Sequence, residues 1–97
     1  MEKEITSISD WNGKTICTGD TVDLFGMIGT VVFEAGAYGI AFEDSIDWEL
    51  IEGNIYEVTE CDNKPQFCYN DNFISFWELI WNFNCECDYC SVVKLVI

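Results

Sequence analysis

The sequence predicts an α+β domain, mostly β, in which a small antiparallel sheet carries one C-terminal helix and a terminal strand. Two stretches predict this class. Residues 28–42 have the pattern of a β-hairpin, and residues 75–83 have the capping signal and apolar period of a helix. Apolar residues make up 49% of the chain, which is enough material for a core. We therefore expect residues 1–97 to form a single domain.

The predicted hairpin lies at the centre of the sheet. Its arms, 30–34 and 38–43, favour strands, and the connection between them contains the glycine that a tight turn needs. Alternation along each arm separates one face from the other. The residues expected in the core are Val31, Phe33, Ile40, Phe42, Ile55, Leu79 and Ile80.

Shorter elements are predicted on both sides of the hairpin. Strands are expected over 15–17 and 21–25, and Gly26 with Gly29 indicates a bend or bulge before the hairpin. Residues 43–47 are expected to form an acidic loop or a single helical turn.

Two further segments connect the hairpin to the C-terminal part. Residues 48–58 are predicted to be another strand pair, interrupted by the turn-forming dipeptide Gly53-Asn54. Residues 61–72 are polar, contain the one proline and are expected to form a connecting loop.

A predicted helix begins after Ser75, because Ser75-x-x-Glu78 is a capping box. Trp77 and Trp81 lie four residues apart on its flank. They either widen the contact with the core or form an exposed aromatic anchor for a protein partner. Residues 89–97 are expected to return to the sheet as a strand. The apolar face of the helix comprises Phe76, Leu79, Ile80 and Phe83.

Three blocks of sequence carry a resemblance to a known family. In order, they are Asn12-Gly13-Lys14-x-Ile16-x-x-Gly19-Asp20-x-Val22, Gly29-x-Val31-x-Phe33 and Ile51-Glu52-Gly53-Asn54-Ile55-Tyr56-Glu57. Over residues 10–57 the chain resembles the YopX family of phage and prophage proteins. The resemblance implies a β-rich, SH3-like or barrel-like domain, here residues 10–58, encoded by a phage or mobile element. That family has no assigned catalytic residues. Residues 58–97 depart from its pattern, and 59–97 form a helix-plus-strand extension in which any special activity is expected.

The charge balance is strongly acidic, with 18 acids against 4 lysines and a net charge of −14. No basic residue lies between Lys14 and Lys64, whereas eleven carboxylates do, from Asp20 to Asp62. Such a surface repels phosphate groups, so we expect neither direct nucleic-acid binding nor binding to an anionic membrane. Acidity also confers solubility, which is the alternative explanation.

Catalysis is not expected. The chain contains no histidine, which removes the usual proton shuttle and the common nucleophile–base pairs. A carboxylate pair such as Asp44 and Asp47 could do acid–base work, but a solvated acidic loop is the simpler interpretation. Neither a phosphate-binding glycine loop nor a calcium loop occurs in the sequence. We predict no catalytic residue and no cofactor.

The C-x-C-x-x-C motif is the tightest group of potential metal ligands. A structural zinc site needs four ligands, and this spacing differs from paired C-x-x-C motifs. The neighbours Glu86 and Asp88 are expected to raise thiol pKa values. We therefore expect reduced thiols without metal, and a zinc-stabilised module is the alternative. Its candidate ligands are Cys85, Cys87 and Cys90, with Cys61 and Cys68 upstream.

No targeting signal is apparent in the sequence. Residues 1–14 have no apolar run of the signal-peptide kind, and no stretch approaches the roughly 20 apolar residues of a membrane span. We expect the protein in the cytoplasm of the host cell.

These expectations converge on a binding protein. We expect a non-catalytic, phage-encoded acidic protein that inhibits a host nucleic-acid-handling protein by occupying its basic groove, as an anti-CRISPR or other counter-defence protein would. The alternatives are a small phage structural or regulatory protein whose acidity only gives solubility, and the zinc-stabilised module. The predicted partner-binding residues are Glu43, Asp44, Asp47, Glu49, Glu52, Glu57, Glu60, Trp77 and Trp81.

Overall fold

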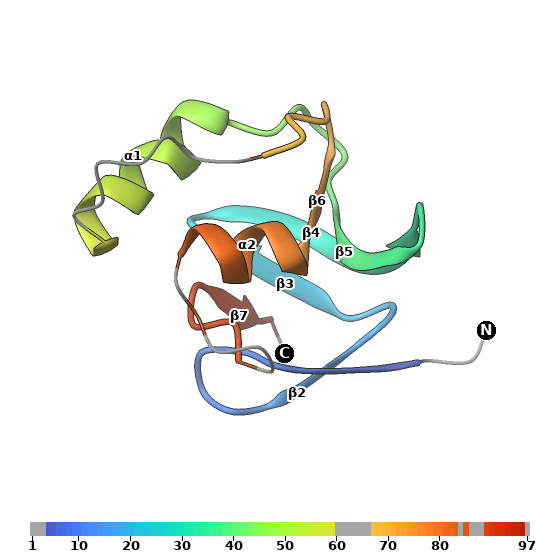
Figure 1. Cartoon of the computed structure of the whole chain (residues 1–97). Helices are drawn as coiled ribbons and strands as arrows, with labels where there is room; N and C mark the ends of the chain where they lie inside the picture. Colours follow the sequence, from blue (N-terminus) through green and yellow to red (C-terminus); the bar gives the residue numbers. More distant parts are fainter. Residues whose placement is uncertain (1–3, 60–66, 84, 86–88, 97) are drawn as a thin grey trace.

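A five-stranded antiparallel sheet forms the centre of the molecule (Figure 1). The structure is a computed structural model that describes residues 4–59, 67–83, 85 and 89–96, with the backbone alone described for 55–59. The strand order is β6-β5-β4-β3-β7. The bounds are Thr21–Leu24 for β3, Met27–Glu34 for β4, Ala37–Ala41 for β5, Phe73–Ser75 for β6 and Val93–Leu95 for β7.

Two tight hairpins join β3, β4 and β5. Each has a two-residue turn with both φ angles positive, 54° and 92° at Phe25 and Gly26, and 51° and 80° at Ala35 and Gly36. Turns of this kind match the twist of the strands that they join, so the predicted central hairpin is confirmed. The β3–β4 register is regular, and the expected bend at Gly26 is therefore a hairpin turn without a bulge. Gly29 lies inside β4, where an added Cβ would lie 2.9 Å from the Ala41 carbonyl oxygen.

A second sheet of two strands, β1 (Ile5–Ser9) and β2 (Thr15–Cys17), completes the β structure. Its register shifts near Ser7, which has a φ of 64°. The buried Thr6 hydroxyl donates to the Ile16 carbonyl (2.7 Å) and supports this irregular strand. The Gly19 N–H donates to the Val31 carbonyl (2.7 Å) and ties the segment after β2 to the large sheet. The α+β, mostly β, class is thus confirmed.

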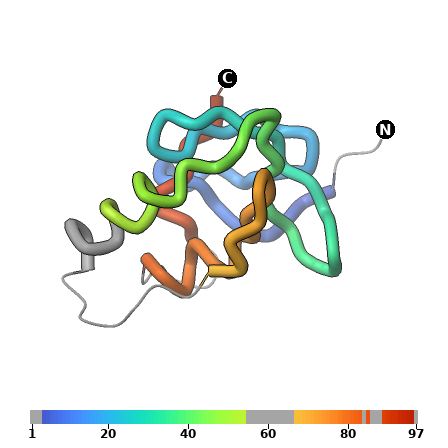
Figure 2. Tube along the Cα trace, turned by 90° about the horizontal axis from the view of Figure 1, so that it is seen from above, coloured from blue at the N-terminus to red at the C-terminus, as the bar shows by residue number. Residues whose placement is uncertain are grey.

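The segment predicted as a second strand pair is a helix, α1 (Trp48–Thr59), and the prediction was wrong. Asp47 caps it, because the Leu50 N–H donates to Asp47 Oδ1 (3.1 Å). The Asn54 side-chain amide donates to the Leu50 carbonyl (2.9 Å), so Gly53-Asn54 lies inside the helix instead of forming a turn. Seen from above, α1 extends away from the sheet (Figure 2).

The predicted C-terminal helix is confirmed as α2 (Phe76–Asn82). Its capping box is complete, since the Glu78 N–H donates to Ser75 Oγ (3.2 Å) and the Ser75 N–H donates to Glu78 Oε2 (2.8 Å). The helix packs against β5 and β6 (Figure 1). Among the described helices, neither is long and apolar enough to cross a membrane.

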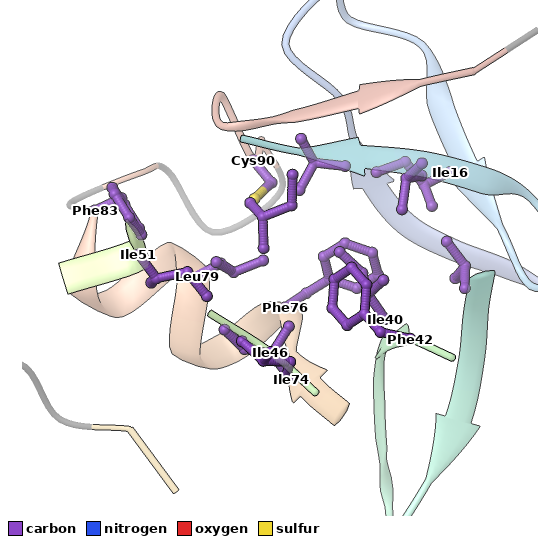
Figure 3. Packing of buried hydrophobic residues seen from close by; sticks show 14 residues of the cluster. Ile16, Ile40, Phe42, Ile46, Ile51, Ile74, Phe76, Leu79, Phe83 and Cys90 are labelled. Carbon is purple, nitrogen blue, oxygen red and sulfur yellow. The ribbon is translucent and has the colours of Figure 1, made fainter. Parts of the chain in front are cut away.

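The core lies between the large sheet and α2, and it also receives residues from β2 and α1 (Figure 3). Val31, Ile40, Phe42 and Leu79 are buried as predicted, and Ile80 is partly buried. Phe33 is 54% exposed, so its prediction was wrong. It lies beside the Ala35-Gly36 turn, where its ring contacts Tyr38. Ile55 lies outside the described side chains. Buried residues that were not in the predicted core include Ile16, Ile46, Ile51, Ile74 and Phe76.

Candidate functional site

The predicted acidic surface begins on the loop between β5 and α1. Glu43 and Asp44 are exposed there, and Glu49 is exposed on the first turn of α1. The loop is held at both ends by backbone hydrogen bonds to residues 71–72. The Phe42 N–H donates to the Asn72 carbonyl and the Ile46 N–H donates to the Asp71 carbonyl, both at 2.7 Å. The side chain of Ile46 is buried, so the loop presents its carboxylates from an anchored backbone.

Two of the predicted partner-binding acids have structural roles. Asp47 caps α1, as described above. Glu52 accepts a hydrogen bond from the Tyr69 hydroxyl (2.6 Å) and so connects α1 to the segment before β6. Glu57 and Glu60 lie outside the described side chains. The carboxylates best placed to meet a partner are therefore Glu43, Asp44 and Glu49.

The two tryptophans of α2 lie outside the core. Trp77 and Trp81 are each 62% exposed, and their rings stack with a centroid separation of 5.6 Å and an interplanar angle of 7°. The two indole rings are therefore exposed and do not widen the contact with the core. Their use as an anchor for a protein partner stays a prediction.

A groove of about 480 Å³ lies next to the acidic loop. One wall is the start of β4, residues 27–30, and the other is the chain from Ala41 to Ser45. The groove exists because β4 is longer than β5, whose pairing with β4 stops at Thr30↔Ala41. Sequence reasoning did not find it, because it depends on where two strands part. The arms predicted from the sequence, 30–34 and 38–43, gave no signal of it, because they are nearly equal in length.

The structure brings two thiols of the C-x-C-x-x-C motif together. A hydrogen bond from the Cys90 thiol lowers the pKa of Cys85 to about 6. Burial opposes this shift, and Ser91, whose Oγ lies 3.4 Å from Cys85 Sγ, supports it. The same pairing and burial raise the pKa of the buried Cys90. The pKa of Cys85 is thus lowered, whereas the sequence predicted raised thiol pKa values from Glu86 and Asp88, which lie outside the described residues.

The zinc alternative stays a prediction to be tested. Cys61 and Cys87 lie outside the described residues. Within the part of the chain that the structure describes, no three potential ligands come together. The predicted absence of catalysis is likewise untested, although Asp47 of the candidate carboxylate pair is engaged as a helix cap.

These features define an acidic α+β protein with an anchored carboxylate loop, an adjoining groove and an exposed tryptophan pair. Compared with known proteins, the chain matches no protein-family model, no curated protein and no solved structure. The resemblance to the YopX family therefore stays a sequence-based prediction.

Proposed function

We propose that this protein is a non-catalytic inhibitor that binds a basic, nucleic-acid-binding surface of a host protein and presents carboxylates where phosphates would lie. The observation that carries the proposal is the anchored display of Glu43, Asp44 and Glu49 in a chain of net charge −14. Phage-encoded counter-defence, including inhibition of CRISPR effectors, is the specific form proposed.

Electrostatics supports a cationic partner. Like charges gathered on one surface repel each other and disfavour the compact state. A lysine- and arginine-rich surface turns that unfavourable field into steered, fast association. A loop whose backbone is already anchored also loses little backbone freedom when its carboxylates bind.

The Trp77/Trp81 pair provides a second contact in this proposal. Charge complementarity accelerates association and selects partners, whereas buried aromatic anchors slow dissociation. Replacing both tryptophans by alanine is therefore expected to raise the dissociation rate, with a smaller effect on the association rate.

The test begins with a pull-down from host lysate at low and high salt, followed by mass spectrometry and by binding measurements on the purified partner. Affinity should fall steeply with salt, and nucleic acid should compete for the same surface. Glu43→Lys with Asp44→Lys should lower the association rate by about ten-fold. A double reversal at Glu4 and Glu34, both exposed, changes the net charge equally and serves as the matched control.

An affinity that is indifferent to salt and to the Glu43/Asp44 reversal would contradict the proposal. The acidity would then serve solubility, as in a small structural or regulatory phage protein. A strong effect of the tryptophan substitutions alone would make α2 the interaction surface.

A further inference from the structure

We propose that the groove beside the acidic loop is a binding site for an extended basic peptide and receives one of its lysine or arginine side chains. This inference rests on the proposed function and specifies where the cationic partner is recognised. The reasons are the chemistry of the two walls and the direction of the β4 backbone.

The residues of the groove walls are complementary to a lysine or arginine side chain, which carries its charge at the end of an aliphatic chain. The residues that line the groove include the apolar Met27, Ile28 and Phe42 and the acidic Glu43 and Asp44. Ile28 is 54% exposed although it lies within a strand. Lysine and arginine place methylene stems on apolar surface and keep the charged head near carboxylates or water. A small metal ion or a neutral apolar molecule would use only one half of this lining.

The backbone of β4 offers a second contact. The Val31 N–H donates to the Asp20 carbonyl (2.9 Å), which shows that the peptide groups of Val31 face the β3 side. Because these groups alternate along an antiparallel strand, those of Ile28 and Thr30 face the β5 side. Thr30 pairs with Ala41, but Ile28 lies beyond the last residue of β5. Its N–H and C=O therefore point toward the groove, where an extended peptide can add to the strand.

The second wall of the groove is fixed by the fold. At Phe42 the chain stays paired with the β6 side, because the Phe42 N–H donates to the Asn72 carbonyl and continues the β5–β6 register. Gly29 allows this arrangement, since a Cβ at this position would lie 2.9 Å from both Phe42 Cδ1 and the Ala41 carbonyl oxygen. The groove is thus a consequence of backbone hydrogen bonding and does not require a flexible side chain to move.

The test is an amide NMR titration of the ¹⁵N-labelled protein with an acetylated, amidated hexaarginine peptide at low ionic strength. The largest shifts are expected at residues 27–30 and 41–45.

Asp44→Asn and Glu34→Gln each remove one negative charge, and Asp44→Asn should weaken binding about three-fold more. Ile28→Ser should weaken binding by about three-fold. Phe33→Ser, at an equally exposed apolar position of the same strand (54%), should leave it unchanged.

A second pair of probes tests the role of the stem. Hexalysine and hexaornithine carry equal charge at pH 7, but each ornithine stem is one methylene shorter. Recognition in the groove predicts tighter binding of hexalysine, by up to about four-fold if one methylene is fully buried. Equal affinity of the two peptides would show that charge alone is recognised and would overturn the inference.

The outcomes separate the groove from the wider proposal. Salt-dependent binding with shifts centred on Glu49 and α1, and equal effects of Asp44→Asn and Glu34→Gln, would exclude the groove while leaving the acidic-surface proposal standing. Failure of every cationic peptide to bind, even at low salt, would contradict both.

Discussion

At the scale of single residues, Asp10 connects the two ends of the chain. It is 1% exposed, and its Oδ1 accepts hydrogen bonds from the N–H groups of Asn12 (3.0 Å) and Lys14 (2.8 Å). Its Oδ2 accepts from the N–H of Leu95 in β7 (3.0 Å). One buried carboxylate thus holds the turn between β1 and β2 and the edge strand of the large sheet.

Replacing Asp10 by alanine should lower the free energy of unfolding by about 2–4 kcal/mol, because three partly buried backbone hydrogen bonds lose their charged acceptor. Urea denaturation measures the change. Glu34→Ala removes an exposed carboxylate and should stay within about 0.5 kcal/mol of the unsubstituted protein. Equal effects of the two substitutions would show that the Asp10 hydrogen bonds contribute little to stability.

The thiol of Cys85 is the second residue-scale feature with a measurable consequence. Its pKa of about 6 means that the thiolate predominates at pH 7. Alkylation by iodoacetamide, resolved by tandem mass spectrometry, should show a midpoint near pH 6 at this site. Cys90→Ser replaces the thiol donor and should change this midpoint, whereas the reactivity of Cys17 should not change. A Cys85 midpoint near the ordinary value of 9.0 would contradict the assignment.

The same shift predicts how stability depends on pH. The pKa of Cys85 is lower in the folded state than its ordinary value of 9.0, so between pH 6 and 9 the unfolded chain retains a proton that the folded protein has lost. This group therefore increases stability as pH rises through that interval, and its contribution disappears as pH falls through about 6. The pKa of Cys90 is raised in the folded state. Cys90 therefore decreases stability as pH rises above the pKa that this thiol has in the unfolded chain.

At the scale of elements, the two helices depend on their N-terminal caps. Asp47 begins α1 and Ser75 begins α2, and both side chains accept hydrogen bonds from backbone N–H groups in the first turn. An acidic residue also interacts favourably with the positive end of the helix dipole. The carboxylate at position 47 therefore contributes to the fold even though it lies in the acidic loop.

Asp47→Lys should destabilise the protein by about 1–2 kcal/mol through loss of the cap and an unfavourable charge at the helix N-terminus. Asp44→Lys makes the same change of charge three residues earlier and should have an effect within about 0.5 kcal/mol. Denaturation followed by circular dichroism compares them. If both reversals were equally mild, Asp47 would be free to serve as a partner-binding residue.

The two faces of α2 should differ strongly in their response to truncation. Leu79 is fully buried, and Leu79→Ala should cost about 2–5 kcal/mol of stability. Trp77→Ala removes a largely exposed side chain, and the loss of its stack with Trp81 should cost about 0.5–1.5 kcal/mol. An unfolding midpoint that is unchanged in Leu79→Ala would mean that α2 does not pack on the sheet.

At the scale of the whole molecule, the net charge of −14 sets the response to salt. Self-repulsion within the compact protein is screened as the Debye length falls from about 30 Å at 0.01 M salt to about 10 Å at 0.1 M. The melting temperature should therefore rise as sodium chloride is added over this range. Potassium chloride is the control for specific ion binding and should give the same curve. A melting temperature that falls with salt would show that attractive charge pairs dominate.

Much of the fold follows from local sequence. Strand-forming residues on either side of Ala35-Gly36 determined the central hairpin, and Ser75-x-x-Glu78 determined where α2 begins. These signals act between residues that are close in the chain, so they can be recognised without knowledge of the tertiary structure. Composition alone likewise determined the acidic character on which the proposed function rests.

Contacts between distant residues decided the rest. Gly53-Asn54 favours a turn locally, but Asp47 caps a helix whose Ile51 is buried in the core, so α1 forms. Alternation placed Phe33 with Val31, but burial also depends on whether another element covers that position. The groove arises where the start of β4 meets the chain that follows β5. The periodicity of apolar residues in the sequence indicates which face of a strand or helix a side chain occupies. Only the tertiary structure determines which other residues cover that face.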